Sequence, residues 1–101
     1  MPAMTMVSRW SDSDHDVFVR NATRIKAIWL PNGADDFRVS RIHTGPHVGQ
    51  YEVAIRFSGW KAFADASGRV DQDEEFAAMM TASFNNGRMV DRTFSVDVPL
   101  E

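Results

Sequence analysis

Strict alternation of apolar and polar residues near the middle of the chain constrains the fold more than any other sequence feature. In the segment YEVAIRF, the apolar residues Tyr51, Val53, Ile55 and Phe57 fall on one side of an extended chain. This period of two is typical of a strand with one buried face. The stretch over residues 36–44 predicts a partner strand, joined to the first by a turn that is rich in glycine. The sequence therefore predicts a hairpin that packs one face against a core.

Two helical regions flank the hairpin. Apolar residues recur at helical spacing over about residues 14–30, and Ser13 is expected to cap this helix through a capping box. After the hairpin, Ser58 is expected to cap a second helical region, which Gly68 interrupts and an aspartate cap (Asp71 or Asp73) restarts. The segment NNG ends that region.

Outer strands are expected over residues 4–10 and 89–98, which completes the order strand, helix, strand, strand, helix, strand. This order is that of the ferredoxin-like α+β sandwich, in which a four-stranded antiparallel sheet carries two helices on one face. At 101 residues, the chain is expected to form a single domain over residues 1–101.

Composition excludes several classes of function. The formal net charge of −3 gives no basic footprint, so no nucleic-acid partner is expected. Without cysteine, the chain has no disulfide, thiolate metal site or cysteine nucleophile, which favours a cytoplasmic location. No apolar run is long enough for a membrane span, and MPAMTMVSRW does not resemble a signal peptide. Met1, Met4 and Met6 are each candidate starts, and Leu100–Glu101 is either native or a remnant of cloning.

The glycine-rich turn in RIHTGPHVGQYEVAIRF is not a phosphate-binding loop, because a strand rather than a helix follows it. If residues 45–48 form the loop, Arg41 lies opposite Glu52 and His43 lies opposite Gln50. A loop of even length keeps Arg41 and His43 away from the apolar face, where their burial would be costly. The expected polar face then collects Val39, Arg41, His43, Gln50, Glu52 and Arg56, together with Asp91, Thr93 and Ser95 from the last strand.

The hairpin segment, followed by SGWKAFADA and DEEFAAMM, resembles small bacterial proteins of the dimeric α/β-barrel superfamily. Many of these proteins are uncharacterised, and others are similar to antibiotic-biosynthesis-type monooxygenases and NIPSNAP-like proteins. The resemblance implies a homodimer whose two sheets pack face to face into a barrel, with a small cavity in each half. Its members include cofactor-free oxygenases, haem-degrading enzymes, isomerases and ligand sensors, so the fold alone does not choose an activity.

The candidate site residues lie on the expected polar face and at its edge. His43 is the candidate acid or base, and Arg41 and Arg56 are candidates for stabilising an anion. Their alternative roles are structural: a hydrogen-bonded interface histidine and a cross-strand ion pair between Arg41 and Glu52. The candidate ligand-binding residues are Trp10, Glu52, Asp91 and Thr93. No cofactor and no metal site are predicted, because the histidines and acids do not converge at metal-ligand spacing.

Three functions remain open from the sequence. The first is a cofactor-independent monooxygenase or isomerase acting on a small aromatic or enolisable compound, with His43 taking the proton. The second is a dimer that binds a small metabolite without turning it over. The third is a structural dimer whose polar face is filled by its own ion pairs.

Overall fold

In the computed structural model, four strands and three helices follow one another in an α+β order. The structure describes residues 2–100, and the side chains of residues 82–86 lie outside that description. The elements are β1 (Met4–Asp12), α1 (His15–Trp29), β2 (Asp36–Arg41), β3 (Tyr51–Phe57), α2 (Trp60–Asp71), α3 (Glu74–Asn86) and β4 (Gly87–Val96). Among the described residues, no helix has both the length and the apolar character needed to cross a membrane.

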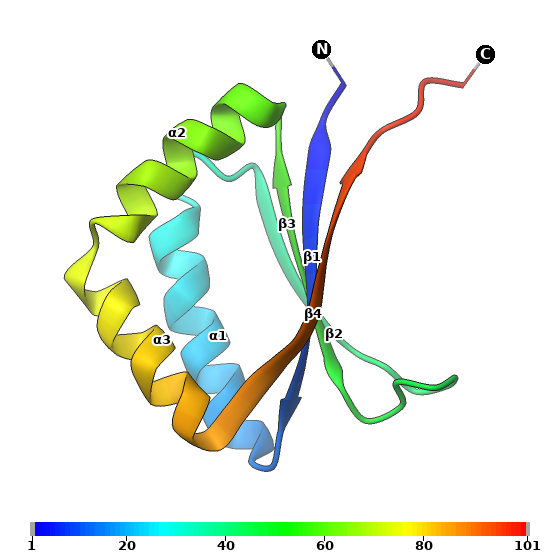
Figure 1. The fold of residues 1–101 in the computed structure, drawn as a ribbon, viewed down its shortest axis with the longest axis vertical. Coiled ribbons are helices and arrows are strands. Elements are labelled where there is room, and N and C mark those ends of the chain that lie inside the picture. Colours follow the sequence, from blue (N-terminus) through cyan, green and yellow to red (C-terminus); the bar gives the residue numbers. More distant parts are fainter. Residues whose placement is uncertain (1, 101) are drawn as a thin grey trace.

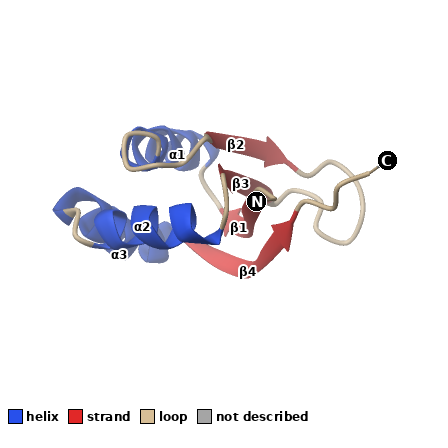
Figure 2. Cartoon of the chain, turned by 90° about the horizontal axis from the view of Figure 1, so that it is seen from above, coloured by secondary structure: helices blue, strands red, loops and turns tan. Residues whose placement is uncertain are grey.

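The strands form one antiparallel sheet in the order β2-β3-β1-β4, and all three helices lie on the same face of it (Figure 1). This arrangement confirms the predicted ferredoxin-like fold. The second helical region is divided into two helices, and the division falls at residues 72–73 rather than at Gly68. The opposite face of the sheet carries no helix, so the chain forms two layers (Figure 2).

The helix caps differ in part from the sequence prediction. Asp14, and not Ser13, caps α1, because its side chain accepts a hydrogen bond from the Val17 amide. Asp73 caps α3 in the same way through the Phe76 amide, as the sequence predicts. The prediction of a Ser58 cap is wrong, since α2 begins after Gly59 without a side-chain cap.

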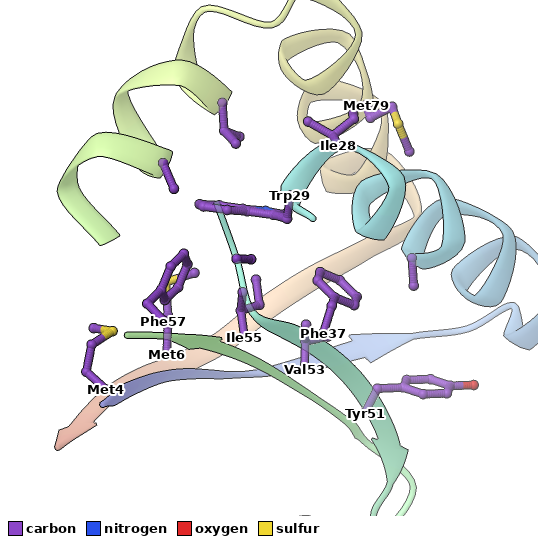
Figure 3. Packing of buried hydrophobic residues seen from close by; sticks show 14 of the residues in the cluster. Met4, Met6, Ile28, Trp29, Phe37, Tyr51, Val53, Ile55, Phe57 and Met79 are labelled. Atoms are coloured by element: carbon purple, nitrogen blue, oxygen red, sulfur yellow. The ribbon is translucent and has the colours of Figure 1, made fainter. Parts of the chain in front are cut away.

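The core lies between the helices and the two central strands, whose apolar side chains point toward the helices (Figure 3). Phe57 is fully buried and contacts Trp29 of α1 edge to face, at a centroid distance of 5.6 Å. Trp29 in turn contacts Phe76 of α3. These aromatic contacts join the sheet to two helices, so the apolar alternation of β3 and the stripe of α1 meet as predicted.

The predicted register of the hairpin is wrong by one residue. Arg41 lies opposite Tyr51, and not opposite Glu52. The Ile42 amide donates to the Gln50 carbonyl and the Gly49 amide donates to the Ile42 carbonyl, which leaves a loop of odd length over residues 43–49. Gly45 and Gly49 adopt positive φ angles of 91° and 89°, which favour glycine at both ends of this turn.

The energetic reason for this register is Phe37 of β2. In the observed register its side chain faces the helices and is 4% exposed, whereas the predicted register would turn it to the opposite face. Burying a phenylalanine side chain stabilises a fold by roughly 1.5–3 kcal/mol. Arg41 avoids the expected penalty because it lies at the end of an edge strand, remains exposed and places its guanidinium 5.1 Å from the centre of the Tyr51 ring.

Candidate functional site

A cavity lies between the helix-facing side of the sheet and helices α1 and α3. About 80 Å³ of it is accessible to the centre of a water molecule. A single water needs roughly 10–15 Å³ by this measure, so the space is large enough for a small organic molecule. Its lining residues come from all four strands and both helices: Met6, Ser8, Trp10, Asp12, Phe18, Asn21, Ala22, Ile25, Trp29, Phe37, Val53, Ile55, Phe76, Met80, Gly87 and Arg92.

Most of the lining is aromatic or aliphatic. Trp10, Phe18, Trp29, Phe37 and Phe76 contribute five rings from β1, α1, β2 and α3. Flat apolar walls of this kind favour a planar ligand, because ring faces stack at low conformational cost.

Few polar side chains reach the cavity: two from β1, one from α1 and one, described below, from β4. The Ser8 hydroxyl accepts a hydrogen bond of 2.8 Å from the Trp10 indole nitrogen. Asn21 lies on the same face of α1 as Phe18, three residues away. Asp12 lies at the end of β1, where its Oδ1 accepts a hydrogen bond from the Asp14 amide. A small number of placed polar groups in an apolar cavity is typical of ligand sites.

Asp12 is held against the start of β4 by a close approach at Gly87. A Cβ atom at residue 87 would lie 2.8 Å from Oδ2 of Asp12 and 3.0 Å from the Ser11 carbonyl oxygen. Only glycine fits at this distance without a shift of the chain. Gly87 thus lets the two strand ends close one end of the cavity.

Arg92 is the one cation among the described lining residues. It lies on β4 opposite Ser8 of β1, on the helix-facing side of the sheet. Phe94 and Val96 of the same strand share this side with it. Its side chain is exposed, and no carboxylate pairs with it among the residues that the structure describes. A guanidinium at the edge of an aromatic cavity is suited to bind an anionic or partly anionic oxygen of a ligand.

The sequence-predicted site residues do not come together in one place. Trp10 lines the cavity, as expected for a residue near a pocket. Arg41 lies on the helix-facing side, with its guanidinium over Tyr51, so the predicted polar cluster with Glu52 is wrong. His43 is exposed in the loop between β2 and β3 and is outside the cavity lining.

The remaining candidates, Glu52, Arg56, Asp91 and Thr93, lie on the helix-free face of the sheet. Two of them form ion pairs with residues that the sequence analysis did not select as site residues. Asp91 pairs with Arg9 on the neighbouring strand, and Arg56 pairs with Asp97, which directly follows β4. The hydrogen bond to Asp97, with the charge of that carboxylate, raises the pKa of Arg56 above its ordinary value. Arg56 is thus a fixed cation that is already paired, which leaves it poorly placed to bind a substrate anion.

A third group of polar residues lies around the buried ring of Tyr51. Nδ1 of His15 lies 2.7 Å from the Tyr51 hydroxyl, and Phe18 stacks on the Tyr51 ring at 4.0 Å between centroids. The Tyr51 hydroxyl therefore has a hydrogen-bond partner, and its ring contacts both Phe18 and the Arg41 guanidinium. Within the described part of the chain, no group of three or more histidine, aspartate or glutamate side chains is arranged to hold a metal.

Sequence reasoning missed Ser8, Asp12, Asn21 and Arg92 as site residues. Each carries a signal in retrospect, because each is a polar residue at a position where its element otherwise presents apolar residues to the helices or sheet. Ser8 interrupts the alternation of β1 and Arg92 interrupts that of β4. Asn21 lies within the apolar stripe of α1.

The two-layer arrangement is the ferredoxin-like fold, and the solved structures described below share it. Neither a family model nor a curated protein matches this sequence.

Several solved structures share this fold over nearly the whole chain. SnoaB, a cofactor-independent oxygenase from Streptomyces nogalater, matches 99% of this chain and 97% of its own at a TM-score of 0.68 and 15% identity. A dimeric ferredoxin-like protein from an uncultured marine organism matches 100% of both chains at a TM-score of 0.70 and 12% identity. A NIPSNAP family protein from Agrobacterium tumefaciens matches 98% of this chain and 94% of its own at a TM-score of 0.63 and 13% identity. Identities this low show likeness of fold alone.

Proposed function

We propose that the protein binds a small planar aromatic or enolisable compound in the cavity between the sheet and the helices, and oxidises it as a cofactor-independent monooxygenase. The observation that carries this proposal is the aromatic cavity with one carboxylate, Asp12, and one unpaired cation, Arg92, among its described lining residues. The similarity in fold to SnoaB, which is a cofactor-independent oxygenase, supports the same proposed activity.

The chemistry requires little of the protein beyond proton removal and anion binding. Without a cofactor, the electrons that reduce dioxygen must come from the substrate. Removal of a proton next to a carbonyl gives an enolate, which is electron-rich enough to react with dioxygen. Overall, one CH₂ group and one O₂ become one C=O group and one water. The protein accelerates this reaction if it takes the proton and stabilises the enolate oxygen.

Asp12 and Arg92 supply these two roles in the proposal, with Asn21 as a further hydrogen-bonding group in the lining. Asp12 accepts the proton, and the Arg92 guanidinium faces the oxygen on which negative charge develops. These assignments replace the role predicted for His43, which lies outside the cavity, and that of Arg56, which is paired with Asp97.

The proposal is tested with 2-indanone, a two-ring enolisable ketone, as the probe. We expect the protein to accelerate exchange of its α-protons with deuterated water under nitrogen, followed by oxygen uptake and dione formation in air. Exchange is read by proton magnetic resonance and oxygen uptake with an oxygen electrode, against a protein-free reaction.

Two variants localise the activity. Ala22 is buried on α1 and lines the cavity, so Ala22→Leu is expected to fill the space and abolish binding and exchange. Ala64 is exposed on α2, so Ala64→Leu is expected to leave both unchanged. Thermal stabilisation by 2-indanone without exchange or oxygen uptake would instead support the non-catalytic, metabolite-binding alternative, which the small number of titratable lining groups favours. Absence of binding would refute both functions.

We further propose that two copies pair through the helix-free face of the sheet. A neighbour of the same fold is dimeric, which supports pairing in general. The β2–β3 loop and the C-terminal segment both extend from the sheet on the side away from the helices, where they would flank a partner sheet (Figures 1 and 2). The Nε atom of Arg9 on this face is buried and has no hydrogen-bond partner among the described residues. A second sheet would offer it an acceptor.

Val7→Asp is expected to disrupt this dimer, because Val7 lies on the helix-free face between Ala54 and Thr93. Enclosing an unpaired carboxylate between two sheets should weaken association roughly 100-fold or more. Val19→Asp is the matched control, since Val19 is exposed on α1. Sedimentation velocity at micromolar concentration should give a dimer for wild type and the control, and a monomer for Val7→Asp. A monomeric wild type would refute the proposed assembly.

A further inference from the structure

Ser8 is a buried hydroxyl in an otherwise apolar position. It is 5% exposed and is the only polar residue among the buried residues that the structure describes. Its neighbours on the same face of β1 are Met6 and Trp10, and it lines the cavity with both of them. Burial of a hydroxyl is unfavourable unless the group is hydrogen bonded, so its presence here calls for partners.

The hydrogen bond from Trp10 uses Ser8 only as an acceptor. The Trp10 indole nitrogen donates to Ser8 Oγ at 2.8 Å, so Ser8 acts as the acceptor in this bond. A serine hydroxyl also carries one hydrogen to donate. Within the described residues, no acceptor takes that hydrogen, and the cavity is the open space beside it. Accepting the Trp10 bond also polarises the hydroxyl, which makes it a better donor.

Ser8 and Arg92 face each other across neighbouring strands. They are register partners on β1 and β4, both on the helix-facing side of the sheet. Directly opposite residues in an antiparallel pair have Cβ atoms roughly 4.5–5.5 Å apart. One oxygen atom of a bound molecule in this part of the cavity is therefore within reach of a neutral donor and a cationic donor together.

We propose that Ser8 donates a hydrogen bond to the carbonyl oxygen of the bound ligand, and that Trp10, Ser8 and Arg92 together form the group that recognises this oxygen. The inference rests on the proposed function and makes it more specific. It assigns the ligand as a planar ketone or phenol whose oxygen points toward the β1–β4 pair, with its rings toward α1 and α3. The same two donors would strengthen their bonds as negative charge develops on that oxygen.

Calorimetric titration with indane and 2-indanone tests this recognition, because the two molecules differ by the ketone oxygen. We expect wild type to bind 2-indanone more tightly than indane. Ser8→Ala should lower the affinity for 2-indanone about fivefold to tenfold, the usual effect of one neutral hydrogen bond. Its affinity for indane should stay unchanged, since the apolar walls remain. Ser8→Thr keeps the hydroxyl and should keep the preference for the ketone.

The outcomes separate this inference from the proposed function. If wild type binds both molecules equally, or if Ser8→Ala weakens both equally, the hydroxyl does not recognise the oxygen and the inference is wrong. The cavity would still be a binding site in that case. If wild type binds neither molecule, the proposed function and this inference fail together.

Discussion

Phe57→Ala is expected to lower the free energy of unfolding by about 4 kcal/mol. Phe57 is fully buried at the end of β3 and contacts Trp29 of α1 and Phe63 of α2 edge to face. Its loss leaves a hole where the sheet meets two helices, so transfer and cavity terms both apply. A domain of this size has a total stability near the low end of roughly 5–15 kcal/mol, so the variant should be close to unfolding. Equilibrium unfolding in urea measures the change.

Phe94→Ala is the matched control for this prediction. Phe94 also contacts Phe63, but it lies on the edge strand β4 and is 42% exposed. The same chemical change there should lower stability far less, because much of that ring already touches water. Equal losses in the two variants would contradict the assignment of the core to the central strands and helices.

Arg92→Gln is expected to reduce the rate of α-proton exchange from 2-indanone by roughly 100-fold to 1,000-fold, the usual cost of losing one donor to a developing oxyanion. The effect should fall on kcat more than on KM, because the charge on the oxygen develops in the transition state. The free energy of unfolding should change by less than about 0.5 kcal/mol, since the Arg92 side chain is exposed.

Arg38→Gln provides the comparison at a distance from the cavity. Arg38 lies on the helix-free face of β2, where it pairs with Asp36 at 3.1 Å and remains largely exposed. We expect wild-type exchange rates from this variant. Similar rate losses in both variants would mean that a general effect of positive charge, rather than contact with the ligand, explains the result.

The fold follows from local patterns in the sequence. The alternation of β3 and the helical stripe of α1 both depend on side-chain periodicity, which the sequence shows directly. The predicted register was wrong because the cost of burying Arg41 and His43 does not by itself decide how the strands pair. The burial of Phe37 and the positive φ angles of the turn glycines favour the observed register instead. Arg41 has no burial cost in this register, because it lies at the exposed end of an edge strand.

The candidate site is harder to predict, because it depends on which faces of distant elements meet. The sequence indicates that Arg41, His43 and Glu52 lie near one another along the chain, yet one residue of register separates them in space. Ser8 and Arg92 are far apart in sequence and become neighbours only through the pairing of β1 with β4. The sequence pattern that does predict the site is a polar residue within an otherwise apolar face, as at Ser8 and Arg92. Both residues line the cavity and not the helix-free face.

A crystal structure of the protein with 2-indanone tests the central claim most directly, since the claim is that the cavity between sheet and helices is the binding site. We predict density for the two rings among Trp29, Phe37 and Phe76, with the ketone oxygen within hydrogen-bonding distance of Ser8 or Arg92. An empty cavity with the ketone on the helix-free face, near Glu52 and Thr93, would contradict this claim. The binding site would then lie on the polar face of the sheet.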